Sequence, residues 1–313
     1  MQYALQGKIE DPQKILKNLA LVYTCHGFRG DPAKLKMAML TGYFDESGIA
    51  PAEKLCVVAG YVGDEAQWGA FINDWITALG NHRRNLHMTQ LRWNRRYDKI
   101  VSDLARLGPI PNRYNLTAVR IGIWHQDYDD LLRGKVNERF CNPYIICAQC
   151  CIGAVADGVL ASNDEAMFIF DRQEGRRADA MEVLHQVVFK IAKMDHRIKD
   201  IDFRPRVSTV CLDPADYYAY GYRAFQVDRE SPRAKACLPI ADTENKAHGG
   251  ILSREQVQDI ANHYKEHGMV PGSKQKRLSD QLVRALFKAG WTQEGVEKLR
   301  KYVDEKNKKG AWE

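Results

Sequence analysis

The fold is decided by residues 37–48, which read MAMLTGYFDESG. The first part of this stretch, residues 37–44, is a short apolar run that is typical of a buried β-strand. The run ends in the turn sequence DESG, so acidic groups stand directly at the end of the predicted strand. A second run rich in β-forming residues follows at 55–62, and the pair is predicted to form a hairpin.

Strand and helix patterns are mixed along the chain after this hairpin, which indicates an α/β fold. Further strands are predicted at 115–124, 166–171 and 207–212. The spacing of apolar residues predicts helices at 64–79, 97–107, 127–133, 144–160, 178–193 and 217–225. Asp64 is the expected N-cap of the first helix. We therefore expect a mixed sheet with helices on both faces.

Composition divides the chain into four segments. They are an N-terminal extension at 1–38, a main domain at 39–235, a loop or linker region at 236–274 and a basic helical C-terminal region at 275–313. Most of the formal net charge of +6 lies in the last of these. Its predicted helices could pair with a second copy of the chain or with a partner protein.

The overall composition is that of a soluble globular protein, with 45% hydrophobic and 27% charged residues. There is no apolar stretch of the ~18–20 residues that a membrane span needs, and no secretory signal at the N-terminus. The eight cysteines show no disulfide-scaffold spacing, which favours reduced thiols in a cytoplasmic protein. Cys147, Cys150 and Cys151 are better explained as thiols of a buried helix than as a zinc site, because zinc needs four ligands.

Three acids stand at comparable places, each at the end or start of a predicted element: Asp45, Asp171 and Asp216. Strand ends gather at one edge of a sheet, so residues far apart in sequence can converge there. Carboxylates packed together repel each other, and a hard cation relieves that repulsion. Magnesium prefers oxygen ligands, and manganese suits the same donors. The pattern therefore predicts a site for Mg²⁺ or Mn²⁺.

Four segments together resemble the ordered motifs of the family catalogued as domain of unknown function 3800. They read GYFDESG at 42–48, AGYV at 59–62, FD at 170–171 and LDPADYYAY at 212–220. In the last motif Asp213-Pro214 replaces the Gln and apolar residue that the family usually carries before Ala-Asp. The resemblance covers roughly residues 40–225.

The resemblance implies a ribonuclease H-like fold for the main domain and a metal-dependent nuclease, in a mobile-element or defence context. The residues that match its expected metal ligands are Asp45, Asp171 and Asp216. Glu46 and Glu174 are weaker candidates for a fourth ligand or a general base. His87 lies where the family often carries a histidine, and could contact a scissile phosphate or shuttle a proton. The alternative for His87 is a packed histidine without a chemical role.

Basic residues interleaved with aromatic ones suggest nucleic acid as the partner. The candidates are Arg83, Arg84, Arg95 and Arg96, with Trp93 and Tyr97 between and beside them. Arg172 and Arg176 follow Asp171 closely and could grip phosphates in bidentate fashion. A solvated basic surface is the alternative explanation for both groups.

Two hypotheses of different classes remain open at this point. The first is a nuclease that hydrolyses phosphodiester bonds in DNA or RNA with Mg²⁺ or Mn²⁺. The second is a binding module for nucleic acid or protein, in which the acids are structural, since an Asp at a strand end is also good turn and cap chemistry. The sequence does not separate DNA from RNA, endonuclease from exonuclease, or hydrolysis from strand transfer.

Overall fold

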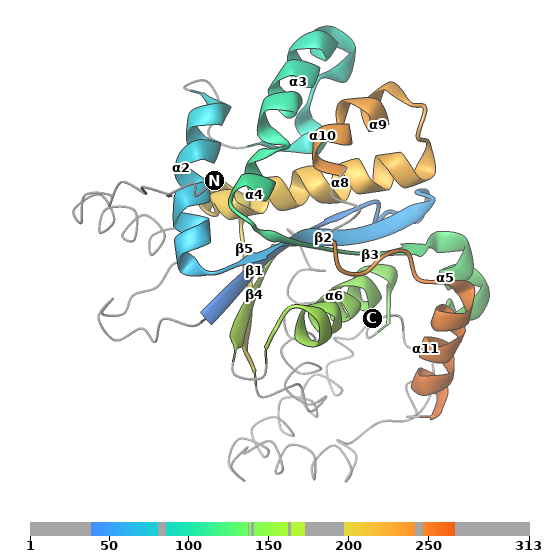
Figure 1. Ribbon diagram of the computed structural model, residues 1–313. Helices are drawn as coiled ribbons and strands as arrows, with labels where there is room; N and C mark the ends of the chain where they lie inside the picture. Colours follow the sequence, from blue (N-terminus) through green and yellow to red (C-terminus); the bar gives the residue numbers. More distant parts are fainter. Residues whose placement is uncertain are drawn as a thin grey trace, which may run out of the picture.

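The structure, a computed structural model, describes residues 39–80, 86–136, 138, 141–161, 164–172, 197–241 and 247–266. Within these ranges five strands form one mixed sheet in the order β3-β2-β1-β4-β5 (Figure 1). Their bounds are β1 Met39–Ser47, β2 Leu55–Gly63, β3 Thr117–Trp124, β4 Glu165–Asp171 and β5 Ile198–Arg204. The strand β1 pairs antiparallel with β2 and β2 with β3, whereas β4 runs parallel to β1 and β5 to β4. The expected α/β class with a mixed sheet is confirmed.

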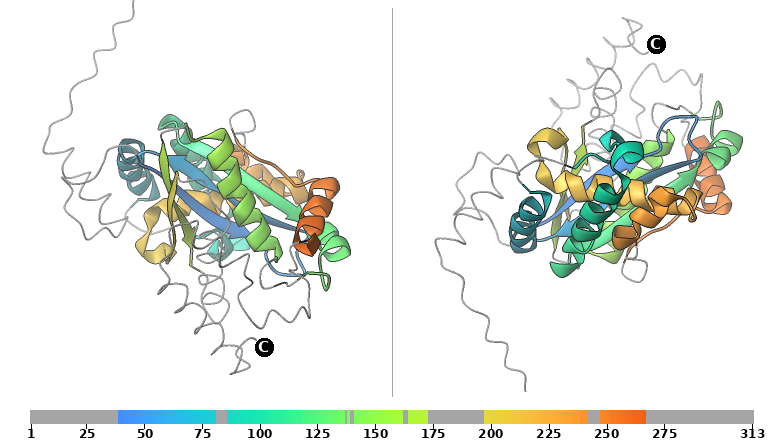
Figure 2. Two further views of the ribbon diagram at one scale, coloured as in Figure 1. Left: turned by 90° about the horizontal axis from the view of Figure 1, so that it is seen from below. Right: turned by 90° about the horizontal axis from the view of Figure 1, so that it is seen from above.

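Helices cover both faces of this sheet, as expected. Their bounds are α2 Glu65–Leu79, α3 Trp93–Leu107, α4 Ile110–Arg113, α5 His125–Leu131, α6 Pro143–Gly158, α8 Asp213–Val227, α9 Pro232–Ala236, α10 Leu238–Ala241 and α11 Arg254–Glu266. Three 3₁₀ turns join them, η2 Met88–Gln90, η3 Arg206–Ser208 and η4 Val210–Leu212. Helix α8 lies across one face and α6 across the other (Figure 1, Figure 2).

The alternation of side chains along the central strands builds a separate apolar core on each face. On the α8 side, Tyr43 packs edge-on against Trp68 of α2, and the Tyr61 ring lies 5.2 Å from that of Tyr218 in α8. On the α6 side, Phe44 stacks on Phe170 with ring centroids 5.3 Å apart. Both faces of β1 and β2 are buried, which explains their nearly continuous apolar sequences.

Two local predictions about helices are confirmed. Asp64 caps α2 in a capping box, in which its side chain accepts the Gln67 N–H at 2.7 Å and the Gln67 side chain accepts the Asp64 N–H at 2.8 Å. The apolar helix α6 is buried against β2 and β3, and its residues Cys147 and Cys151 are free thiols within that core.

The prediction of a fifth strand at 207–212 is wrong. This segment forms the turns η3 and η4, and Val207 is 84% exposed where a strand would have buried alternate residues. The actual fifth strand, β5, precedes it. Its sequence IKDIDFR buries only Ile201 and Phe203 and carries charged residues between them, as edge strands commonly do. Such a charged edge strand has too weak an apolar signal for the pattern to detect.

The range 236–274, expected as a loop or linker, differs from that expectation where the structure describes it. It contains α10 and α11, and its backbone pairs with the free edge of β3. The Arg120 N–H donates to the His248 carbonyl at 3.0 Å, and the Gly122 N–H to the Gly250 carbonyl at 3.0 Å. Gly249 has a φ of +83°, and a Cβ there would meet the Arg120 carbonyl at 2.3 Å, so this close approach requires glycine. Gly249, one of the glycines that suggested a loop, is therefore a site of close backbone packing.

None of the helices in the described ranges combines the length and the apolar composition needed to cross a lipid bilayer. The segments expected at 1–38 and 275–313 lie outside the described residues, as does the helix expected at 178–193.

Candidate functional site

Two of the three predicted acids lie side by side at the C-terminal ends of two neighbouring parallel strands. Asp45 is on β1, which continues three residues further than predicted, and Asp171 is the last residue of β4. The register pairs Phe44 with Phe170, so the two acids follow as neighbours on parallel strands. Asp45 is buried, with 1% of its surface exposed.

The third acid reaches the same place from a helix. Asp216 lies in the first turn of α8, where negative charge is favoured by the helix dipole. A residue that the sequence patterns did not single out, Arg206, opens η3 two residues after β5 ends. Because β5 is parallel to β4, the residues after β5, including Arg206, lie at the same end of the strands as Asp171.

The guanidinium of Arg206 contacts all three carboxylates. Its Nη2 donates to Asp171 Oδ2 at 2.6 Å and to Asp45 Oδ2. Its Nη1 donates to Asp216 Oδ2 at 2.5 Å. Its backbone N–H also donates to Asp171 Oδ1 at 3.2 Å. The expected convergence of Asp45, Asp171 and Asp216 is therefore present, with Arg206 at its centre, and we call these four residues the acid cluster.

The acid cluster carries three carboxylates against one guanidinium, in a place largely removed from water. Burial is the main cause that raises the pKa of Asp45 well above its ordinary value, and the nearby charges of Glu46, Asp216 and Asp171 add to it. Burial also raises the pKa of Asp171, against the opposing effect of Arg206. Burial lowers the pKa of Arg206, but the charges of Asp45, Asp216 and Asp171 outweigh it, so the pKa is raised overall. The cluster therefore favours additional positive charge.

The segment Leu86 to Met88 is attached to the first turn of α8 beside the cluster. The Met88 N–H donates to Asp216 Oδ2 at 2.7 Å, and the Leu86 N–H donates to Asp213 Oδ2 at 2.8 Å. His87 lies between them, with Nδ1 3.2 Å from Asp216 Oδ2 and within contact of Arg206. Its side chain is 31% exposed, so it stands between the buried acids and solvent.

Asp213 is a second functional candidate that the patterns did not single out as a site residue. It is completely buried, and besides the Leu86 N–H it accepts the Trp75 Nε1–H at 3.4 Å. Its Oδ1 has no hydrogen-bond partner in the described residues. Burial raises the pKa of Asp213 to about 8, despite the lowering effect of the Leu86 and Trp75 hydrogen bonds.

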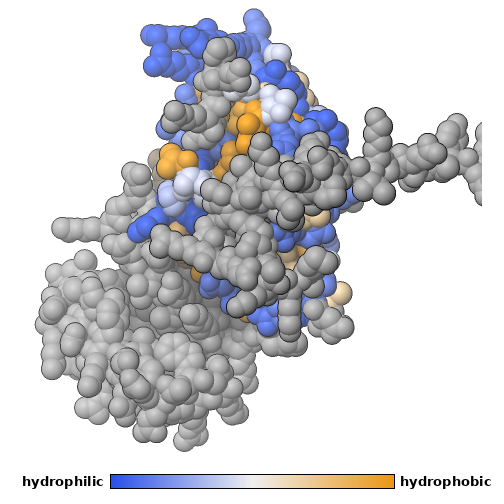
Figure 3. Space-filling model, turned by 90° about the vertical axis from the view of Figure 1, so that its left-hand side faces the viewer, coloured by the Kyte–Doolittle hydropathy of each residue, from blue (hydrophilic) through white to orange (hydrophobic). Residues whose placement is uncertain are grey.

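Among the other predicted site residues that the structure describes, Glu46 is near enough for its charge to raise the pKa of Asp45, but it lies on the other face of the sheet. Successive strand residues point to opposite faces, so Glu46 faces α6 whereas Asp45 faces α8. Arg172 is exposed directly after β4, and Arg95 and Arg96 are exposed on α3. The end of the molecule at which α3 lies is hydrophilic in the space-filling view (Figure 3). The remaining predicted residues, Glu174, Arg83, Arg84 and Arg176, lie outside the described residues.

The position of Arg206 could have been predicted only from the position of β5 in the sheet. Once that strand is placed next to β4, the residues that follow it must lie at the edge that carries Asp171. Asp213 could have been noticed more easily, because the family that the sequence resembles usually carries an uncharged residue there. It also stands three positions before Asp216 and so lies on the same helix face.

Comparison of the chain with protein-family models and with curated proteins finds no match.

The cluster fits a hard divalent cation in the type of its donors, all of which are carboxylate oxygens. The raised pKa of Asp45 and the excess of acids over cations point the same way. As they stand, the carboxylates surround the guanidinium, and no group of three or more His, Cys, Asp or Glu side chains in the described residues is arranged to hold a metal ion. A metal would therefore have to take over contacts that Arg206 makes.

Proposed function

We propose that this protein is a metal-dependent nuclease of ribonuclease H-like fold that cuts phosphodiester bonds in DNA or RNA. One observation carries the proposal: three acids from β1, β4 and the start of α8, distant in sequence, meet around one cation at the end of the sheet. A mixed sheet with helices on both faces agrees with the fold that the sequence resemblance implies.

In this proposal Asp45, Asp171 and Asp216 hold Mg²⁺ or Mn²⁺. When bound, such an ion supplies an acidified water and stabilises the charge that develops on the phosphate. Asp45 and Asp171 are fixed by neighbouring parallel strands, and Asp216 is fixed by the Met88 N–H, so the donors are held by the rigid part of the fold.

The other residues of the site have roles that follow from their positions. Arg206, once its carboxylate partners are shared with a metal, offers a planar fork of donors that suits a phosphate. His87 lies on the solvent side of Asp216, and the contact between its Nδ1 and Asp216 Oδ2 orients the ring. Thr89 Oγ1 lies 3.1 Å from the other ring nitrogen, Nε2. This places an imidazole where a proton can pass between the site and water.

The test is a cleavage panel on single- and double-stranded DNA, RNA and hybrid, with Mg²⁺, Mn²⁺ or EDTA. We expect metal-dependent cleavage that Asp45→Asn reduces at least about 100-fold, since a metal ligand contributes several kcal/mol of charge stabilisation. Asp202→Asn is the matched control, because Asp202 lies on the edge strand β5 and pairs with Arg204 outside the cluster. Equal cleavage by the wild type and Asp45→Asn would refute the role of the acid cluster.

The position of Arg206 also favours a second candidate function. A guanidinium with three carboxylate partners is an ion-pair network that holds the acids together without a metal, as in a binding module whose acids are purely structural. This candidate predicts a folded protein that cuts none of the substrates and binds no metal. Stoichiometric binding of Mn²⁺ that depends on Asp171 separates the two functions in favour of the nuclease.

A further inference from the structure

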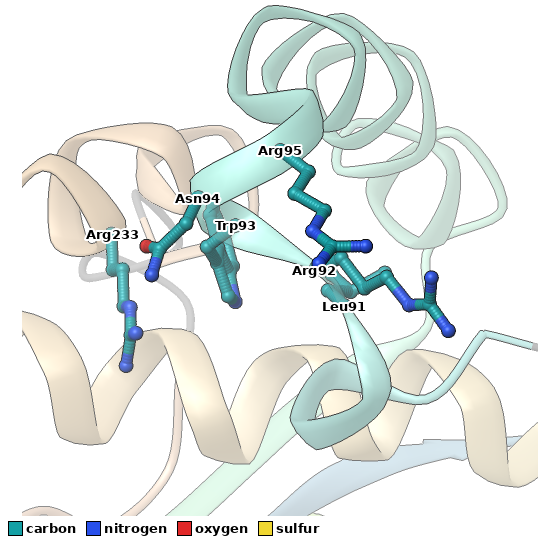
Figure 4. A pocket seen from close by; sticks show the side chains of 6 residues that line it. All are labelled: Leu91, Arg92, Trp93, Asn94, Arg95 and Arg233. Carbon is teal, nitrogen blue, oxygen red and sulfur yellow. The ribbon is translucent and has the colours of Figure 1, made fainter.

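A hollow of about 450 Å³ lies where α3 begins, on the side of the sheet covered by α8 (Figure 4). Its lining consists of Leu91, Arg92, Trp93, Asn94, Arg95 and Arg233. Figure 4 shows Arg92 and Arg95 on one side of Trp93 and Arg233, which comes from α9, on the other. We call this feature the arginine hollow.

The three guanidinium groups of the arginine hollow have no acidic partner in the part of the chain that the structure describes. The arginine ion pairs in the described residues are formed by other arginines, such as Arg106, Arg133 and Arg254. The lining of the hollow contains no Asp or Glu. Like charges on one stretch of surface repel each other, and an anion bound beside them relieves the repulsion. Arginine in particular matches the geometry of phosphate oxygens.

The floor of the hollow is held by aromatic stacking and by a cation–π contact. The Trp93 ring stacks on Tyr220 of α8, with centroids 6.2 Å apart and 10° between the planes, and the Arg233 guanidinium lies 5.9 Å from the Trp93 ring centroid. Trp93 is 7% exposed, and its Nε1–H has no hydrogen-bond partner in the described residues. The Nε1 atom itself is shielded from solvent, so Trp93 contributes a packed surface to the hollow.

The arginine hollow adjoins the acid cluster through two independent parts of the chain. On α8, Asp216 belongs to the cluster and Tyr220 supports the hollow, and four helical residues span about 6 Å on one helix face. On the segment before α3, Met88 contacts Asp216, and Trp93 follows five residues later. A nucleic-acid strand carries a phosphate about every 3.4 Å of helix axis, so a strand at the cluster has further phosphates within reach of the hollow.

We propose that the arginine hollow binds backbone phosphates of the nucleic-acid strand close to the bond that the acid cluster cuts; this rests on the proposed nuclease function. Arg92, Arg95 and Arg233 are binding residues, and Trp93 is the platform that holds Arg233 in place. The hollow contacts the sugar-phosphate backbone, so it binds strands without regard to base sequence.

The test measures binding in EDTA, so that no cleavage occurs. Full-length protein is titrated against fluorescein-labelled single-stranded DNA and RNA of about 12 nucleotides, at several KCl concentrations. The test variant is Arg92→Gln/Arg95→Gln/Arg233→Gln. The matched control is Arg106→Gln/Arg133→Gln/Arg254→Gln, which removes the same charge from exposed arginines elsewhere. Thermal melts verify that both variants are folded.

We expect the hollow variant to raise Kd at least about tenfold, and to reduce the slope of log Kd against log salt by about 0.7 for each phosphate that is no longer neutralised. The control loses the same overall charge but no phosphate contact, so it is expected to change Kd less than about threefold and to leave the slope unchanged. Should the triple variant be unfolded, Arg92→Gln/Arg95→Gln leaves the contact between Arg233 and Trp93 intact and is expected to reduce the slope by about 1.4.

Three results would overturn the proposal: a hollow variant that binds like the control, a wild type that binds neither oligonucleotide, or displacement by poly-glutamate as effective as displacement by unlabelled strand. The last would assign the hollow to an acidic protein. The nuclease function is tested separately by the cleavage panel, in which it fails if the wild type cuts none of the substrates. Binding that depends on the hollow in a protein that cuts nothing would support the hollow and refute the nuclease.

Discussion

Two arginine sites on one side of the sheet have opposite surroundings. In the acid cluster, Arg206 is largely buried and contacts three carboxylates. In the arginine hollow, Arg92, Arg95 and Arg233 are exposed and lack acidic partners in the described residues. Burial of a charge requires partners within the protein. A surface charge is already solvated and stays free to bind a ligand.

The contrast indicates what each site is suited to bind. The acid cluster has more negative than positive groups in a setting that penalises charge, so it suits a small cation. The arginine hollow has three positive groups and no acidic residue in its lining, so it suits an anion. A phosphodiester with its metal is the kind of substrate that needs both sites next to each other.

The largest effect is expected from removing the buried cation. Arg206→Ala leaves three buried carboxylates without their partner, and loss of one member of a buried ion pair costs about 3–5 kcal/mol. Urea denaturation in EDTA measures the loss in the free energy of unfolding. Added Mg²⁺ is expected to restore part of it, because a ligand that binds only the folded state stabilises that state.

The control for this prediction is Arg254→Ala. Arg254 also has two carboxylate partners, Asp127 and Asp130, but at the surface, so its removal is expected to leave the free energy of unfolding almost unchanged. Similar losses in Arg206→Ala and Arg254→Ala would show that burial does not distinguish the acid cluster from surface ion pairs.

An effect that is smaller per pH unit is expected from Asp213→Asn, which removes a buried acid and keeps its shape. The pKa of Asp213 is raised by burial from 3.8 to about 8, so the folded state binds this proton more tightly than the unfolded state. The stability that this provides is complete below the unfolded pKa and is lost as the pH rises through the folded pKa. We therefore expect the wild type to lose up to about 1.4 kcal/mol per pH unit relative to Asp213→Asn within that window.

Urea denaturation of both proteins at pH 5, 6.5 and 8 checks the prediction on Asp213. The amide retains an oxygen for the Leu86 and Trp75 donors, and the expected result is a flatter dependence of stability on pH in the variant. Parallel curves for the two proteins would mean that Asp213 titrates alike in both states, contrary to the prediction.

The smallest effect is expected at the arginine hollow. Because Arg92 and Arg95 are exposed and form no ion pair with the described residues, Arg92→Gln/Arg95→Gln is expected to change the free energy of unfolding by no more than about 0.5 kcal/mol for each substitution. The same denaturation assay measures it. A loss that approaches that of Arg206→Ala would show that these side chains stabilise the fold, and would remove the basis for a ligand site.

Much of the fold could be predicted because three strands are apolar runs inside the sheet and a fourth, β3, has an alternating pattern. The central strands β1, β2 and β4 are buried on both faces, and an unbroken apolar run records that directly. The edge strand β5 is buried only at Ile201 and Phe203, and the neighbouring β-formers at 207–212 gave a stronger but misleading signal. Local propensity does not tell which segment meets the sheet edge.

The same limit separates the predicted from the unpredicted part of the site. Asp45, Asp171 and Asp216 stand at the ends of elements with clear patterns, so their convergence could be inferred. Arg206 depends on the position of β5, and the arginine hollow depends on how α9 packs beside α3, which brings Arg233 to Trp93. Contacts between separate helices leave no periodic trace in the sequence.

The most direct test of the central claim is a calorimetric titration of Mn²⁺ into the metal-free wild type and Asp45→Asn. We predict that the wild type binds one or two ions per chain, in line with the number that one or two carboxylates per ion allow. The variant is predicted to bind at least about tenfold more weakly, a loss of about 1.4 kcal/mol or more. Equal binding by both proteins, or no binding by the wild type, would contradict a metal site at the acid cluster.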